Sequence, residues 1–129
     1  MPTTHRGTWT GRMMTGVAFV ALFADGLSQL LAPAPVTAMM REVGFPPNMG
    51  PLLGSIMVGC AALYALPATA VLGAIMVTGF LGGAICAHVR LGEVGSPPEI
   101  LSIFLGMIAW SSLYLRDPRL REVLPLVRR

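Results

Sequence analysis

The hydrophobic positions of this chain gather in four long apolar runs instead of alternating with polar positions. The runs extend over residues 13–31, 50–66, 70–89 and 100–115, and none shows the one-sided pattern of a half-solvated helix. About 20 helical residues cross the hydrocarbon core of a bilayer, which is roughly 30 Å thick. We therefore predict four membrane-spanning helices, the second of which crosses with little tilt because its run is short.

Glycine and proline residues mark the connections between the runs. Residues 36–43 predict a short helix at the membrane interface, which ends in a turn at residues 44–48. Residues 66–69 are a minimal connection, so the second and third helices must be antiparallel neighbours. A polar loop over residues 91–99 precedes the fourth run. The expected fold class is an all-α integral membrane four-helix bundle with up-down-up-down topology.

A cleaved signal peptide is the competing interpretation of the first run. Arginines precede this run and Ala32-Pro33-Ala34 follows it, as in many secretory signals. The run is too long for such a signal, however, and Asp25, Ser28 and Gln29 interrupt it before any cleavage point. We therefore expect the first run to remain as a spanning helix.

Composition supports a membrane protein and argues against other classes. Hydrophobic residues make up 54% of the 129 residues and charged residues only 12%, and the mean hydropathy is strongly positive. A soluble domain would need more charge to cover its surface. The formal net charge is only +3, from which we infer no nucleic-acid partner. The expected partner is the lipid bilayer, with other membrane subunits or further copies of the chain as open alternatives.

The positions of the arginines predict the orientation. Four crossings place both termini on one side, together with seven of the nine arginines, against Arg41 and Arg90 on the other side. Because positively charged residues favour the cytoplasmic side, we expect both termini to be cytoplasmic. Residues 1–12 then form a cytoplasmic N-terminal segment, and residues 116–129 form a basic cytoplasmic tail.

Asp25 is the only carboxylate within any predicted span. A charged side chain near the bilayer centre costs about 2.5–3.5 kcal/mol on insertion scales, so Asp25 needs compensation. Gln29 lies one helical turn away, and His88 and Arg90 fall at the outer end of the third run, in the same leaflet half. We expect these four side chains to form an inward-facing polar cluster on the extracytoplasmic side, in which Asp25 contacts His88 or Arg90.

A weak internal repeat points to the same pairing. At one constant offset, five residues of the first run recur in the third, and this register aligns Asp25 with His88. It indicates a parallel repeat of two helical hairpins, although so few matches among common membrane residues leave the repeat an open question. The matching pairs are Met13 and Met76, Thr15 and Thr78, Gly16 and Gly79, Ala21 and Ala84, and Ala24 and Ala87.

Three interpretations of the aligned pair stay open. A buried ionic or hydrogen-bonded pair of Asp25 and His88 would only fix the helix register. A binding or proton-handling site would use the histidine, which titrates near neutral pH. In the third interpretation, His88 simply meets interfacial water or lipid headgroups.

Two other features have structural interpretations. Gly79 and Gly83, continued by Ala87, form a smooth ridge that is typical of close helix packing. Cys60 lies near mid-membrane and Cys86 near the outer boundary, so we expect no disulfide between them. Their spacing also indicates no metal site.

Several stretches match a family pattern over nearly the whole chain. They are Thr15-Gly16 leading to Asp25-Gly26, Pro33-Ala34-Pro35, Gly44-Phe45-Pro46, Ala70-Val71-Leu72-Gly73, Thr78-Gly79-Phe80-Leu81-Gly82-Gly83-Ala84 running on to His88-Val89-Arg90, and Leu115-Arg116-Asp117-Pro118-Arg119-Leu120. In these stretches the chain resembles the DoxX-like family of small bacterial membrane proteins with four predicted spans. The resemblance implies a four-helix bundle in the bacterial cytoplasmic (inner) membrane. It implies little about activity, although the family takes its name from proteins associated with a thiosulfate:quinone oxidoreductase.

Three functions follow from the residues and the resemblance. The leading hypothesis is a non-catalytic subunit or small-ligand binder whose outward-facing polar site contains the four side chains Asp25, Gln29, His88 and Arg90. The second is a quinone-facing subunit or anchor of an oxidoreductase, in which His88 hydrogen-bonds a quinone carbonyl. The third is a small transporter, which the concentration of polar residues on the outer half disfavours. No cofactor other than a quinone is indicated, because no haem-ligand pair lies at matching depth.

Overall fold

The computed structural model describes residues 5–31 and 33–124, and within them the chain is helical without any strand. Four of the helices are long and apolar enough to cross a membrane, so the chain is a multi-pass membrane protein. The elements are α1 (His5–Leu31), α2 (Ala34–Glu42), the 3₁₀ turn η1 (Pro47–Met49), α3 (Gly50–Ala65), α4 (Ala70–Arg90), α5 (Pro97–Arg116) and α6 (Pro118–Val123).

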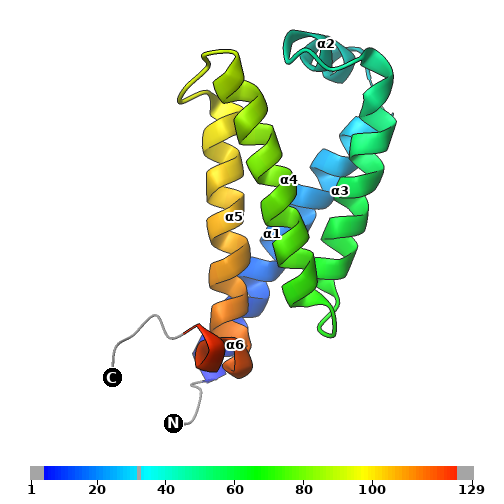
Figure 1. The fold of residues 1–129 in the computed structure, drawn as a ribbon. Coiled ribbons are helices and arrows are strands. Elements are labelled where there is room, and N and C mark those ends of the chain that lie inside the picture. The colour runs from blue at the N-terminus through cyan, green and yellow to red at the C-terminus, as the bar shows by residue number, and fades with distance from the viewer. Residues whose placement is uncertain (1–4, 32, 125–129) are drawn as a thin grey trace.

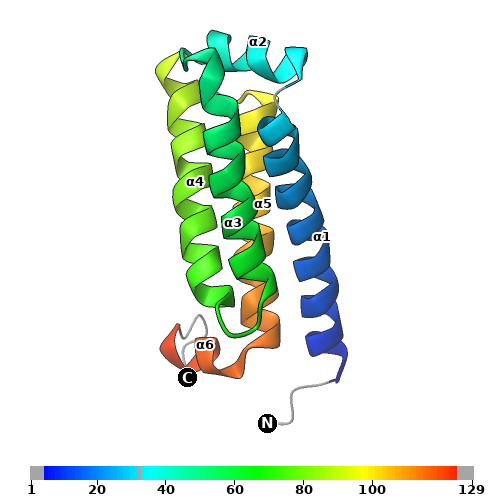
Figure 2. The ribbon, with the colours of Figure 1, turned by 90° about the vertical axis from the view of Figure 1, so that its right-hand side faces the viewer.

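The long helices pack side by side in a closed ring (Figures 1 and 2). α1 packs against α3 and α5, and α4 packs against the same two helices from the other side. α1 and α4 therefore lie diagonally opposite one another. The short helix α2 lies across one end of the ring, and α6 lies at the other end, where it follows α5 (Figures 1 and 2). We name these the α2 end and the α6 end.

Helix α6 occupies part of the segment that the sequence assigned to a basic tail. The side chain of Asp117 accepts a hydrogen bond of 3.0 Å from the backbone N–H of Arg119, and Pro118 takes the first helical position. Arg121 then reaches back, donating from Nε to the carbonyl of Tyr114 at 2.7 Å. This contact satisfies a carbonyl at the end of α5, and it holds α6 against that helix.

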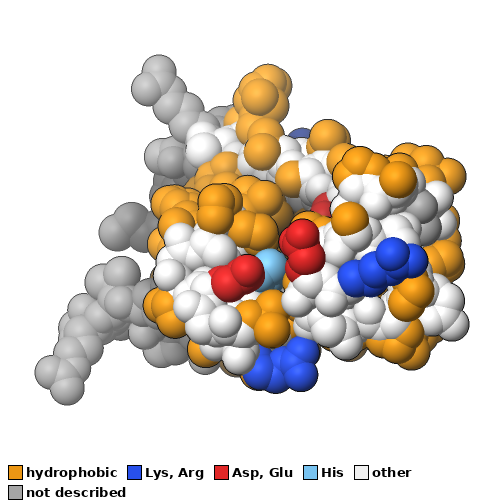
Figure 3. Space-filling model, turned by 90° about the horizontal axis from the view of Figure 1, so that it is seen from above, with side chains coloured by type: hydrophobic (Ala, Val, Ile, Leu, Met, Phe, Trp, Pro, Cys, Tyr) orange, Lys and Arg blue, Asp and Glu red, His pale blue; other side chains and the backbone are white. Residues whose placement is uncertain are grey.

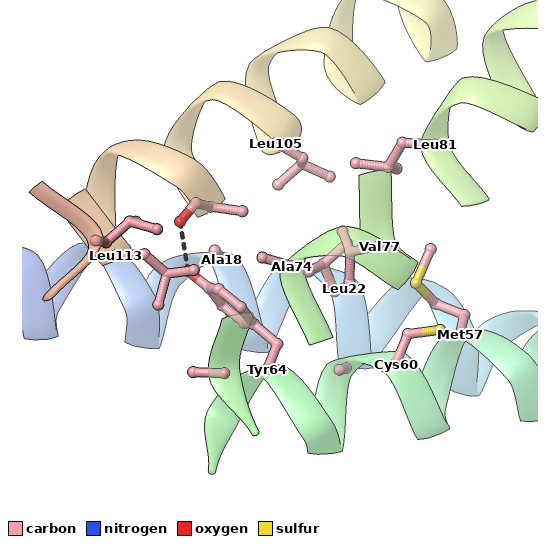
Figure 4. Packing of buried hydrophobic residues seen from close by; sticks show 14 residues of the cluster. Ala18, Leu22, Met57, Cys60, Tyr64, Ala74, Val77, Leu81, Leu105 and Leu113 are labelled. Carbon is pink, nitrogen blue, oxygen red and sulfur yellow. Dashed lines mark hydrogen bonds between the residues drawn. The ribbon is translucent and has the colours of Figure 1, made fainter. Parts of the chain in front are cut away.

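The hydrophobic core is formed by buried side chains from all four long helices, which meet between them (Figure 4). Tyr64 of α3 is fully buried and points toward α5. Its hydroxyl lies 2.5 Å from the hydroxyl of Ser112, which is also fully buried. One hydroxyl donates to the other, and the hydroxyl of Ser112 also lies 2.8 Å from the carbonyl of Ala109, to which it can donate. The core therefore tolerates both groups without an unpaired polar atom.

Two glycines set the distances between neighbouring helices. At Gly73, near the α6 end of α4, a Cβ atom would overlap the backbone of Tyr64. At Gly54, near the α2 end of α3, a Cβ atom would lie only 2.6 Å from the carbonyl oxygen of Gly26 on α1. α1 and α3 therefore stay in contact toward the α2 end, whereas α3 and α4 touch closely at the α6 end and diverge from there (Figure 1).

We predict that Gly73→Ala lowers the thermal unfolding temperature in detergent. The added methyl group would overlap the backbone of Tyr64, and such overpacking costs about 1–3 kcal/mol. Gly59→Ala is the matched control, because a Cβ at Gly59 meets no atom within 4 Å, and it should be neutral or stabilising by up to about 1 kcal/mol. Equal unfolding temperatures for the two variants would contradict the close contact of α3 and α4.

Candidate functional site

A cavity of about 380 Å³ lies toward the α2 end, between the four long helices and beneath α2. Its volume falls within the range of about 300–1,000 Å³ that is typical of small-molecule sites. Its floor consists of core residues, including the fully buried Leu22 and Met57. The lining is Ala21, Leu22, Asp25, Gln29, Met39, Met40, Val43, Phe45, Leu53, Met57, Gly79, Phe80, Leu81, Gly83, Ala84, Ala87, His88, Pro98, Leu101, Ser102 and Leu105.

Asp25 points into this cavity from α1. It shares one face of the helix with Ala18, Leu22 and Gln29, which are all buried. The side chain of Asp25 is nevertheless exposed, because at its level this face of α1 borders the cavity. Its Oδ2 atom accepts a hydrogen bond of 2.7 Å from Nε2 of Gln29.

His88 forms part of the cavity wall on α4, and its side chain is buried. Its Nδ1 atom lies 2.8 Å from Oε2 of Glu93, in the loop that follows α4. Gly92 adopts a φ of 77°, which turns the chain so that the backbone N–H of Glu93 also donates to the carbonyl of His88. The loop thus places a carboxylate against the imidazole at the rim of the cavity.

Arg90 lies outside the cavity lining and fastens α2 to α4. Its Nη2 atom donates a hydrogen bond of 2.8 Å to the carbonyl of Val43, the residue that follows the last turn of α2. A cation is favourable at the C-terminal end of a helix, where carbonyl groups lack helical partners. From the α2 end, Figure 3 shows the histidine between acidic side chains, with arginine side chains farther out.

The predicted contact of Asp25 with His88 or Arg90 is not made in the described structure. His88 pairs with Glu93 and Arg90 with the carbonyl of Val43, while the hydrogen-bond partner of Asp25 is Gln29. The physical reason is that α1 and α4 are diagonal helices with the cavity between them. Asp25, Gln29 and His88 all line that cavity, but they line different sides of it.

The interpretation of Gly79, Gly83 and Ala87 as a packing ridge is wrong for contacts within the described chain. A Cβ atom at Gly79 or Gly83 would meet nothing within 4 Å, and all three residues line the cavity. Both glycines are exposed. The ridge is therefore a smooth wall of the cavity, at the place where α4 has diverged from α3.

Sequence reasoning missed the contribution of α2 and of two phenylalanines. Met39 and Met40 of α2 and Phe45 of the following turn cover the cavity, and Phe80 of α4 adds a second aromatic ring to its lining. The available signal was the apolar face of the short interfacial segment, which includes the buried Met40 and Val43. A surface helix with such a face needs something to cover.

Other chemistry-bearing residues do not converge on the cavity. Cys60 is buried in α3, Cys86 is exposed on α4, and both thiols are free. Among the described residues, no group of three or more His, Cys, Asp or Glu side chains lies close enough to hold a metal ion.

Four apolar helices around a partly polar cavity define a small multi-pass membrane protein. The profile of the DoxX-like family matches residues 13–112, which is most of the chain. The chain therefore belongs to the DoxX-like family, and the resemblance drawn from its motifs is confirmed. Comparisons with curated proteins and with solved structures found no match.

We predict that Arg90→Met accelerates hydrogen exchange of the backbone amides in α2 and the turn after it. The change removes the donor to the carbonyl of Val43, and a hydrogen bond from a charged group is worth about 1.5–3 kcal/mol, so the increase should be about tenfold or more. Arg41→Met is the control, since Arg41 is an exposed arginine on α2 itself. Equal exchange in both variants, measured by mass spectrometry in nanodiscs, would show that Arg90 does not fasten α2.

Proposed function

We propose that this DoxX-like protein is a non-catalytic binding protein that holds a small, largely apolar ligand in the cavity beneath α2. The observation that carries the proposal is the cavity itself, whose apolar lining includes the polar side chains of Asp25, Gln29 and His88. A concave apolar site with a few convergent polar groups is the usual form of a small-molecule site. An ionisable side chain within a membrane-spanning segment is itself a sign of function.

For the arrangement in the membrane, we propose up-down-up-down crossings of the bacterial cytoplasmic membrane with both termini in the cytoplasm. Among the described residues, Arg12, Arg116, Arg119 and Arg121 belong to segments at the α6 end, and only Arg41 and Arg90 belong to segments at the α2 end. The positive-inside rule then assigns the α6 end to the cytoplasm. In this orientation the cavity lies in the outer half of the membrane, with α2 on the extracytoplasmic surface.

The packing toward the α6 end favours binding over transport. Tyr64, Ser112 and Leu113 are almost completely buried there, and none of them lines the cavity. A transporter needs a path that opens to each side in turn. In the described structure the core closes the floor of the cavity, so the cavity has no path to the α6 end.

The position of His88 in the cavity wall favours the quinone-facing subunit as a second candidate function. A quinone ring suits apolar walls, and an imidazole N–H is a hydrogen-bond donor for a quinone carbonyl. In this case the protein would serve an oxidoreductase as a subunit or membrane anchor. The two candidates share the cavity and differ in the chemistry of its occupant.

We predict that Gly83→Phe abolishes ligand binding while the protein stays folded. The ring has room because a Cβ at Gly83 meets no atom within 4 Å, and it would fill the cavity. The probe is 1-aminoanthracene, whose fluorescence rises in apolar sites, titrated into nanodiscs. Gly82→Phe is the matched control, since Gly82 is equally unobstructed but lies outside the lining.

Saturable binding to the wild type and to Gly82→Phe, together with its loss in Gly83→Phe, is the expected result. Identical titrations in all three proteins would overturn the binding proposal. Decylubiquinone tests the quinone candidate in the same assay. If decylubiquinone displaces the probe from the wild type and does so less well in His88→Gln, the quinone candidate is favoured. If decylubiquinone does not displace the probe from the wild type, the quinone candidate is excluded.

We predict that a reporter enzyme active only in the periplasm gives no signal when it is fused after Arg129. Both termini should be cytoplasmic, because seven of the nine arginines lie on their side of the membrane. A fluorescent protein that matures only in the cytoplasm should be bright at the same position. The reverse result would invert the membrane orientation and place the cavity in the cytoplasmic half.

A further inference from the structure

We infer that the cavity binds an ammonium compound, with the cationic nitrogen held by the carboxylate of Asp25 and the apolar body lying among Phe45, Phe80 and the methionines. The inference rests on the proposed binding function and adds the charge and the chemical class of the ligand. It comes from how the charged groups near the cavity are already paired.

The cationic side chains near the α2 end are not available to Asp25. His88 lies 2.8 Å from the carboxylate of Glu93, and Arg90 is bound to the carbonyl of Val43 outside the cavity lining. Arg41 is exposed and does not line the cavity either. In the part of the chain that the structure describes, the ion pair of His88 with Glu93 is the only one, so Asp25 has no cationic partner.

Asp25 is held in place as a hydrogen-bond acceptor. The amide of the buried Gln29 donates to its Oδ2 atom at 2.7 Å, while its Oδ1 atom has no hydrogen-bond partner among the described residues. An anionic group in apolar surroundings is costly unless a cation or several donors compensate for it. A ligand that brings its own positive charge supplies this compensation.

The aromatic and sulfur-containing lining suits such a ligand. Phe45 and Phe80 both line the cavity, and aromatic faces attract quaternary ammonium groups. Met39, Met40 and Met57 supply flexible, polarizable surface for the apolar body. An anionic ligand would instead bring a second negative charge to the carboxylate of Asp25, which disfavours its binding.

Two sources in a membrane carry this chemistry. One is a free amine or quaternary ammonium compound dissolved in the bilayer, and the other is the ammonium headgroup of a phospholipid. The smooth wall at Gly79 and Gly83 borders the cavity where α3 and α4 have diverged, and it has no side chain to obstruct entry from lipid. The shared feature is an ammonium group on an apolar body.

The test compares two probes of equal shape and different charge. Benzyltrimethylammonium and its neutral carbon isostere neopentylbenzene are each titrated as competitors of 1-aminoanthracene. The titrations use the wild type and Asp25→Asn in nanodiscs. Asparagine keeps the size of the side chain and removes its charge. The cation should need about tenfold or more higher concentration in Asp25→Asn, because a partly desolvated charge pair is lost, whereas the isostere should be unaffected.

Each outcome decides the inference separately from the binding proposal. The inference is overturned if the cation displaces the probe equally well from both proteins, or if it fails to displace the probe from the wild type. In either case the result with Gly83→Phe still decides whether the cavity binds ligands. If Asp25→Asn no longer binds 1-aminoanthracene, Asp25→Glu replaces it in the comparison. This variant retains the charge, so displacement by the cation supports the inference and its absence overturns it.

Lipid composition separates the two sources. The displacement by the cation is measured in phosphatidylethanolamine and in phosphatidylglycerol nanodiscs. If the cation displaces the probe less well in phosphatidylethanolamine, and only in the wild type and not in Asp25→Asn, the occupant is the lipid headgroup. A difference that is equal in both proteins excludes the lipid headgroup and leaves a free ammonium compound as the source.

Discussion

The close approach of α4 to the backbone of Tyr64 at Gly73 determines where the rest of the protein has space. α3 and α4 meet backbone to backbone at this point and diverge toward the α2 end (Figure 1), where Cβ atoms at Gly79 and Gly83 of α4 would meet nothing within 4 Å. α1 and α3 do not separate in this way, because Gly54 gives them a second close contact near the α2 end. The cavity lies between α1 and α3, which stay together, and α4, which diverges from α3, and α2 lies across the end of the cavity.

The charged groups near the cavity follow from the same geometry. His88 and Arg90 sit near the end of α4, and each finds a partner in a segment that the chain places there, namely the loop with Glu93 and the end of α2 at Val43. Asp25 lies on the diagonal helix across the cavity and receives only the amide of Gln29. Separation of the helices thus leaves an anionic group facing an apolar space.

The sequence was informative about local structure and less so about how the helices are arranged. Each apolar run lies within a helix except for Leu66, the last residue of the second run, which follows the end of α3. The motifs indicated the correct family. Hydropathy and local motifs are properties of neighbouring residues, so the sequence alone reveals them. The inward direction of Asp25 could also be predicted, since Ala18, Leu22 and Gln29 lie on the same face of the helix. The diagonal placement of α1 and α4 could not, because it depends on contacts far apart in the chain. Gly79 and Gly83 were misinterpreted for a related reason, since small residues mark close packing and open walls alike.

The exposure of Gly79 and Gly83 has a consequence for how any occupant is held. A wall without side chains, on a helix that faces lipid in the proposed arrangement, leaves space that acyl chains can enter. The bilayer is then the solvent of the protein and also a competitor at its cavity. The apparent affinity for an occupant will therefore change with the length and unsaturation of the surrounding acyl chains, even though every contact with the protein stays the same.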